Sequence, residues 1–206
     1  MRPKRMTRTE SRERTRQHLL DAAALCIAEQ GLMATSVEDI VARVGYTRGA
    51  FYSNFSSKRE LFVELLHVKH REIQENLQTL LQDAAVPSGS IRQQFALLHA
   101  CLYPNNVDYI VWAEARLQAI RDAQLRRRVN TMCVERHDII VRFVDRLYDS
   151  CNTRVAISAA DRALIVAAVM DVLPYFSLPT VDEMQNPFVE AILGAVFGSA
   201  IADGLD

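Results

Sequence analysis

Hydrophobic residues recur every three or four positions through most of the chain, the spacing that brings them onto one face of an α-helix. No segment shows the strict alternation of a half-buried strand. The pattern therefore predicts an all-α protein with about nine helices. Their expected ranges are 10–30, 37–43, 48–54, 58–83, 90–102, 106–120 with an extension through 128, 130–150, 159–176 and 187–203.

The first four predicted helices are bounded by residues typical of helix ends. Two glycines act as stops, and hydroxyl side chains in front of the helices can accept hydrogen bonds from the first free N–H groups. For the second helix, either register gives a capping box, Thr35 with Glu38 or Ser36 with Asp39. The expected stops are Gly31 and Gly45, and the expected N-caps are Thr35 or Ser36, Thr47, and Ser56 or Ser57.

The second and third helices are short and flank the turn Val44-Gly45-Tyr46, the arrangement of a helix-turn-helix. Residues expected to pack inside are Ile40, Val41, Val44, Ala50, Phe51 and Phe55. Residues left outside are Thr47, Arg48, Gly49, Tyr52 and Ser53, a set of donors, a cation and an aromatic hydroxyl that suits phosphates and base edges. A small three-helix module with no nucleic-acid role is the alternative interpretation.

Gly49 is unusual inside a helix, where it costs about 1 kcal/mol relative to Ala. A bare Cα would let the backbone approach a duplex closely, which would offset that cost. Lys58 and Arg59 open the fourth helix, where a cation beside free N–H groups could bind a phosphate.

The stretch from Thr35 to Phe62, TSVEDIVARVGYTRGAFYSNFSSKRELF, closely resembles the signature of TetR/AcrR-family regulators. The preceding helix, from Leu20 to Gly31, matches that family's opening pattern. The resemblance covers about residues 12–65 and fixes many residue types at fixed spacing. It implies an all-helical homodimer with a DNA-binding domain at 1–57 and a ligand-binding and dimerisation domain at 58–206.

The resemblance also implies a function and a set of site residues. The DNA-binding domain at 1–57, called the head, would bind a palindromic operator in double-stranded DNA. A small-molecule effector would bind the domain at 58–206, called the body, and release the DNA. The last two helices would form the dimer. Thr47, Arg48, Gly49 and Ala50 match the reading helix, and Tyr52, Lys58 and Thr35 or Ser36 match phosphate-contacting positions. Tyr46, Ser53 and Asn54 depart from the usual residues beside the reading surface; we include Tyr46 and Asn54 among the DNA-binding candidates.

The charge distribution agrees with a nucleic-acid partner at one end. Residues 1–60 carry eleven Lys and Arg against seven Asp and Glu, although the whole chain has a net charge of -1. A basic arm of this kind favours a polyanion, with a solvated tail as the alternative. The basic residues before Gln17 are Arg2, Lys4, Arg5, Arg8, Arg12, Arg14 and Arg16.

The remaining composition predicts a cytoplasmic protein with reduced thiols. The four cysteines, Cys26, Cys101, Cys133 and Cys151, form no C-x-x-C pair. No apolar stretch reaches the ~20 residues of a membrane span, and the basic N-terminus is not followed by the apolar core of a signal peptide.

The C-terminal two-thirds contains no motif that identifies a ligand. Apolar side chains that could line a cavity, or pack as ordinary core, are Leu66, Phe95, Leu98, Trp112, Met132, Phe143, Met170 and Phe176. Polar groups that could orient a ligand are His67, His70, His99, Glu114, Arg116 and His137. His67-x-x-His70 lacks a third metal ligand and is interpreted as two surface histidines, so we predict no metal and no cofactor.

Two further features of this region bear on assembly and function. Gly194 and Gly198 lie four apart among small residues, which would permit close helix–helix approach in a dimer. The three consecutive arginines at 126–128 could form a second nucleic-acid patch or a solvated helix end. No nucleophile–base pair, phosphate loop or dinucleotide fingerprint is present, so no enzyme is predicted. The leading hypothesis is a ligand-released repressor; the alternatives are an activator of the same fold or a small-molecule binding protein.

Overall fold

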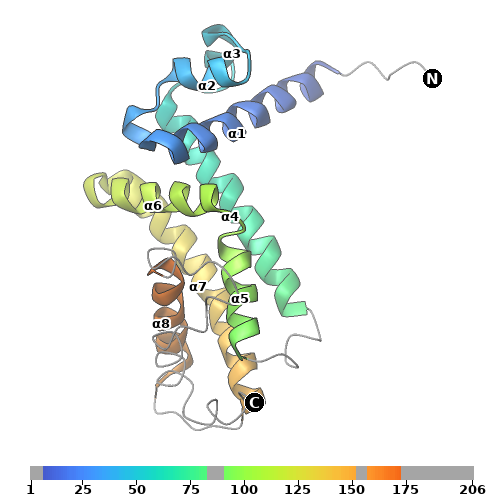
Figure 1. The fold of residues 1–206 in the computed structure, drawn as a ribbon, viewed down its shortest axis with the longest axis vertical. Helices are drawn as coiled ribbons and strands as arrows, with labels where there is room; N and C mark the ends of the chain where they lie inside the picture. The colour runs from blue at the N-terminus through green and yellow to red at the C-terminus, as the bar shows by residue number, and fades with distance from the viewer. Residues whose placement is uncertain (1–6, 83–90, 152–156, 173–206) are drawn as a thin grey trace, which may run out of the picture. The chain divides into compact units, whose positions relative to one another are not determined.

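The computed structural model describes residues 7–82, 91–151 and 157–172 of the chain. These residues form eight α-helices and no strand (Figure 1), which confirms the predicted all-α class. The helices are α1 (Arg8–Ala34), α2 (Val37–Arg43), α3 (Arg48–Tyr52), α4 (Lys58–Gln82), α5 (Ile91–Leu102), α6 (Asn106–Arg121), α7 (Ala123–Cys151) and α8 (Ala159–Val172). The ninth predicted helix, at 187–203, and its Gly194 and Gly198 lie outside the described residues.

The chain divides into two compact units, one made of residues 1–71 and 105–129 and the other of 72–104 and 130–206. The first unit holds α1, α2, α3, the first half of α4, α6 and the first turns of α7. This division passes through α4 and α7, so it does not coincide with the predicted boundary between residues 57 and 58. The roles predicted for the two domains stay predictions.

The core of the first unit lies where α1 packs against α2 and α6, and α2 against α3. Its buried apolar side chains include Leu19, Ala23 and Ile27 of α1, Ile40 of α2, Phe51 of α3, Leu61, Phe62 and Leu65 of α4, and Val111, Trp112 and Ala115 of α6. In the second unit the buried side chains include Leu77, Phe95, Leu98, Met132, Ile140, Phe143, Val166 and Met170.

Gly31 interrupts α1 but does not end it. Its backbone has φ 81° and ψ 159°, a conformation that is essentially restricted to glycine. One further turn follows and ends at Ala34, where the Thr35 N–H donates to the Gly31 carbonyl at 3.2 Å. The predicted stop is therefore a kink, and it directs the chain from α1 into α2.

Asp122 separates α6 from α7, and the predicted extension of the sixth helix through 128 is wrong. The Asp122 backbone is extended, with φ -122° and ψ 106°. Its carboxylate accepts hydrogen bonds from the N–H groups of Gln124 at 2.9 Å and Leu125 at 3.1 Å. These bonds satisfy free donors at the start of α7, so a new helix begins where the apolar periodicity indicated a continuous one.

Candidate nucleic-acid interface

The turn between α2 and α3 is built from local hydrogen bonds. Ser36 caps α2 in a capping box with Asp39, which decides between the two predicted registers. The pKa of Asp39 lies below its ordinary value because its carboxylate accepts from the Ser36 side chain and backbone. Gly45 adopts φ 69°, and the Tyr46 N–H returns to the Val41 carbonyl at 2.9 Å. Thr47 then caps α3 as predicted, so the orientation of this five-residue helix is set from both ends.

The inner and outer residues of the helix-turn-helix divide largely as predicted. Ile40, Val41, Phe51 and Phe55 are buried, whereas Val44 and Ala50 are half-buried. The outer residues Thr47, Arg48, Gly49, Tyr52 and Ser53 are all exposed. One side of α3 therefore presents polar groups and a cation to the outside, as a surface that reads DNA requires.

Arg48 is the charged side chain among these exposed residues of α3, and it contacts Glu38 and Tyr52. Its guanidinium forms an ion pair with Glu38 of α2 at 2.8 Å, and 63% of its side chain remains exposed. The guanidinium carbon also lies 5.8 Å from the centre of the Tyr52 ring. Hydrogen bonding to Tyr52, and then the charge of Glu38, raise the pKa of Arg48 above its ordinary value. The side chain is thus pre-positioned in the exposed layer while keeping free N–H donors.

Tyr46 is held against α1. Its hydroxyl and the Nδ1 of His18 share a hydrogen bond of 2.9 Å, and the two rings stack with centroids 6.1 Å apart. The departure from the family pattern at Tyr46 therefore has a structural partner within the chain. Its predicted contact with DNA stays a prediction.

Two of the predicted phosphate contacts are engaged at the end of α1. Thr35 is buried and its hydroxyl donates to the Gly31 carbonyl at 2.8 Å. The Lys58 ammonium donates to the carbonyls of Leu32 at 2.8 Å, Met33 at 3.4 Å and Thr35 at 2.5 Å. Both side chains thus stabilise the end of α1 in this structure, a role that the sequence pattern did not indicate.

The end of α3 is held by two arginines of α1 that were predicted only as part of a basic arm. Arg12 donates to the Ser53 carbonyl at 3.3 Å, and Arg16 donates to the Asn54 carbonyl at 3.0 Å. Arg16 also pairs with Glu64 at 3.3 Å and lies 4.3 Å from the Phe55 ring centre. Asn54, a predicted DNA-binding residue, is buried, and its amide donates to the Ala50 carbonyl at 2.8 Å.

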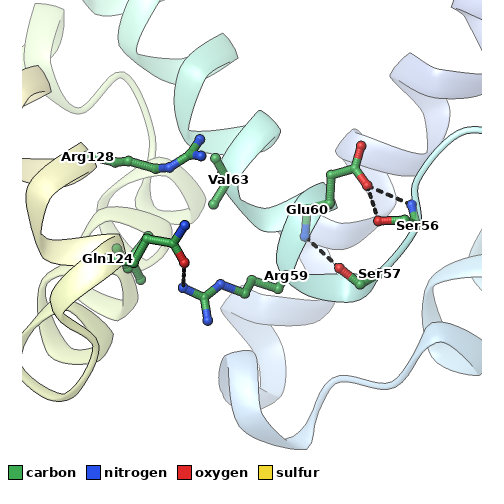
Figure 2. Close-up of a pocket in the computed structure, with 8 residues that line it drawn as sticks. Ser56, Ser57, Arg59, Glu60, Val63, Gln124 and Arg128 are labelled. Carbon is green, nitrogen blue, oxygen red and sulfur yellow. Dashed lines mark hydrogen bonds between the residues drawn. The ribbon is translucent and has the colours of Figure 1, made fainter.

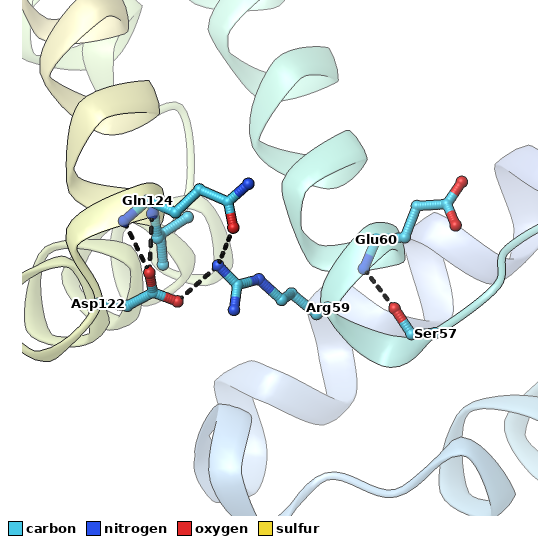
Figure 3. Close-up of polar contacts among 6 residues, drawn as sticks. Ser57, Arg59, Glu60, Asp122 and Gln124 are labelled. Carbon is cyan, nitrogen blue, oxygen red and sulfur yellow. Dashed lines mark hydrogen bonds and ion pairs between the residues drawn. The ribbon is translucent and has the colours of Figure 1, made fainter.

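A cluster of polar side chains connects the start of α4 with the junction between α6 and α7. A hollow of about 250 Å³ lies here, and Figure 2 shows residues that line it, among them Arg59, Gln124 and Arg128. Arg59 crosses it to pair with the Asp122 carboxylate at 2.7 Å and to donate to the Gln124 amide oxygen at 3.0 Å (Figure 3). The Leu125 N–H, followed by the Gln124 N–H and Arg59, lowers the pKa of Asp122. Arg59, predicted beside Lys58 as a phosphate clamp, is therefore engaged with α7.

The candidate ligand-contacting side chains lie in the interior. All of those within the described residues are buried, namely Leu66, Phe95, Leu98, Trp112, Met132, Phe143 and Met170, and Phe176 lies outside them. None of the seven is among the side chains that line the hollow shown in Figure 2. Their assignment to a cavity stays a prediction.

The polar candidates of the same region are distributed differently from the prediction. His67 is exposed but His70 is buried, so the prediction of two surface histidines is wrong for His70. His99 is partly buried, and its loss of solvation lowers its pKa. In the part of the chain that the structure describes, no three His, Cys, Asp or Glu side chains gather as metal ligands, and no helix is long and apolar enough to cross a membrane.

Known proteins resemble the N-terminal part of the chain in sequence and most of the chain in fold. The family of bacterial regulatory proteins called tetR matches residues 19–65. The transcriptional regulator AcrR of Shigella flexneri is 41% identical over 71 residues, which are 34% of this chain and 33% of that protein. The transcriptional repressor KstR2 of Mycobacterium tuberculosis is 47% identical over 51 residues, 25% of this chain and 26% of that protein. The matched region thus spans about a third or less of these relatives.

Among solved structures, a transcriptional regulator from Saccharomonospora viridis in complex with choline has a TM-score of 0.72, with 17% identity over 88% of this chain and 96% of that one. At this identity the likeness shows the fold. The fold and the exposed surface of α3 define a helix-turn-helix protein. Its helix-turn-helix segment, residues 19–65, matches the tetR family of bacterial regulatory proteins.

Replacing Gly49 by Ala tests whether this glycine is needed for the stability of the protein or for DNA binding. An added Cβ would have Thr47 Oγ1 as its nearest neighbour, at an ordinary 3.6 Å, so the variant is expected to be as stable as the wild type or up to about 1 kcal/mol more stable. If α3 approaches DNA by its backbone, affinity is expected to fall at least about tenfold. Thermal unfolding and gel-shift titration measure the two effects.

Gly45→Ala is the matched control for Gly49→Ala. An added Cβ at Gly45 meets nothing within 4 Å, but the positive φ makes the substitution strained. It is expected to lower stability by about 1 kcal/mol. Unchanged DNA affinity in Gly49→Ala would contradict a close approach at this position.

Proposed function

We propose that the protein is a ligand-responsive transcriptional repressor that binds a palindromic operator as a dimer and is released by a small molecule. The observation that carries the proposal is the exposed polar side of α3, with Arg48 held by Glu38 above a buried Phe51. A helix of this kind can enter the major groove, where an arginine can donate two hydrogen bonds to guanine. Such a regulator would work on DNA in the cytoplasm.

The match of residues 19–65 to the tetR family supports a dimer, and the named relatives support repression and the binding of a small molecule. KstR2 is a repressor, and the regulator from Saccharomonospora viridis was solved in complex with choline. A palindromic site matches the two-fold symmetry of a dimer, which places two reading helices about one helical turn of DNA apart. The last two helices are proposed as the dimer contact, and the buried apolar side chains of the body as the surroundings of the ligand.

In vitro selection from a random duplex library tests DNA recognition directly. The full chain is expected to enrich an inverted repeat, and its affinity for that sequence is expected to fall steeply with salt, with a slope of about −0.9 in log–log form for each phosphate neutralised. A scrambled duplex of equal length is the control. Enrichment of no sequence would overturn the proposal.

The selected sequence also tests repression. Placed just downstream of a constitutive promoter in a reporter strain, it is expected to lower expression only when the protein is present. Higher expression with the protein present would favour an activator of the same fold.

A further inference from the structure

A groove runs between the first turns of α1 and the end of α3. Its volume is about 900 Å³, and the residues that line it are Thr7, Arg8, Thr9, Ser11, Arg12, Thr15, Ala50, Ser53 and Asn54. On α1, the positions 8, 11, 12 and 15 follow the three- and four-residue spacing of one helix side. The opposite wall is formed by the end of the helix that carries Arg48.

The chemistry of this groove is that of an anion-binding surface. Its lining contains two guanidinium groups and five hydroxyl groups but no carboxylate. Two other hollows of the same unit differ, since one includes Glu60 among its lining residues and the other includes Glu29 and Asp39. The nearby Glu10 is not among the lining residues, and its carboxylate is held in a capping box, where it accepts from the Thr7 N–H at 2.7 Å.

Arg12 offsets the negative partial charge at the end of α3, which would otherwise disfavour an anion in this groove. The last carbonyls of a helix carry partial negative charge, which would repel a phosphate. Arg12 donates one N–H of its guanidinium to the Ser53 carbonyl at 3.3 Å and retains further donors. Arg8 is exposed, and none of the hydrogen bonds or ion pairs identified among the described residues involves its side chain.

We propose that this groove is a second DNA contact, which takes the sugar-phosphate backbone of the operator strand that flanks the bases read by α3. The inference rests on the proposed function and deepens it. We choose DNA as the occupant because the groove is continuous with α3, the helix proposed to read bases. Ala50 of α3 and its C-cap Ser53 both line the groove. The contact adds affinity and positions the head, but it does not read base identity.

The test compares Arg8→Ala with Arg14→Ala on the selected duplex. Arg14 lies on the same helix, is exposed and does not line the groove, so its removal costs the same charge. Arg8→Ala is expected to weaken binding about fivefold and to reduce the log–log salt slope by about 1 for each groove engaged, while Arg14→Ala stays near the wild type. Arg8→Lys is expected to retain most of the affinity, because a phosphate requires the charge.

Trimming the duplex to the bases that α3 reads provides the second arm. The wild type is expected to lose at least as much affinity on trimming the duplex as Arg8→Ala loses on the long one, because trimming also removes the contacts of Arg12 and the hydroxyl groups. Arg8→Ala is expected to lose less than the wild type on trimming. Equal losses for Arg8→Ala and Arg14→Ala, or an equal effect of Arg8→Ala on both duplexes, would overturn the groove contact while leaving DNA recognition intact. A wild type that selects no sequence would instead overturn the proposed function, and the groove contact with it.

Discussion

Replacing Lys58 by Met is expected to lower the free energy of unfolding by about 2–3 kcal/mol. Methionine keeps an unbranched apolar stem but removes the ammonium that donates to the carbonyls of Leu32, Met33 and Thr35. Those carbonyls lie at the end of α1, where no later residue of the helix can donate to them. Urea unfolding followed by circular dichroism measures the loss.

The control for Lys58→Met is Arg59→Met, one residue further along α4. Arg59 pairs with Asp122 at the surface, and its loss is expected to cost much less because exposed ion pairs contribute little. If Lys58→Met leaves stability unchanged but abolishes DNA binding, the structural role assigned to the ammonium is wrong. That result would favour the phosphate contact that the resemblance implies.

The sequence was sufficient to predict features that depend on neighbouring residues. The range of α2 and the start of α4 agree with the prediction, and the Thr47 cap of α3 is confirmed. Each depends on helical periodicity and on a side chain that bonds within three residues of itself. The burial of Phe51 also follows from local spacing, since the opposite side of a short amphipathic helix has to face the core.

Features that depend on distant partners were missed or misassigned. Lys58 bonds to residues more than twenty positions earlier, and Arg12 and Arg16 reach the end of α3 about forty positions later. A side chain's charge indicates that it seeks a partner, but periodicity does not identify that partner. The break at Asp122 was missed for a related reason, since apolar spacing continues across it and only an N-cap signal distinguishes two helices from one.

The candidate ligand residues illustrate a different limit. An apolar side chain at a buried helical position satisfies the same pattern whether it fills the core or lines a cavity, because both remove it from water. Met132 and Phe143 are buried as either interpretation requires. The head is specified by residue type at fixed positions, whereas the body is specified only by its hydrophobicity.

Replacing Arg48 by Ala is expected to have the largest effect on base recognition. If the guanidinium reaches a guanine, discrimination at that base pair is expected to fall by about 10- to 100-fold, while affinity for unrelated DNA changes far less. The ion pair with Glu38 prepares this contact, since it holds the side chain in the exposed layer above α3. Gel-shift titrations on duplexes substituted at each position of the selected sequence measure the discrimination.

Arg43→Ala is the matched control, because Arg43 lies on α2, is exposed and pairs with Glu29. Loss of its charge is expected to weaken binding to all sequences equally or not at all.

Glu38→Gln is expected to give the complementary result. It removes a negative charge from the reading surface and frees Arg48, so affinity for unrelated DNA should rise while discrimination between bases falls. Equal losses on selected and scrambled duplexes for Arg48→Ala would mean that Arg48 contacts a phosphate, and base readout would then have to come from Thr47 or Tyr52.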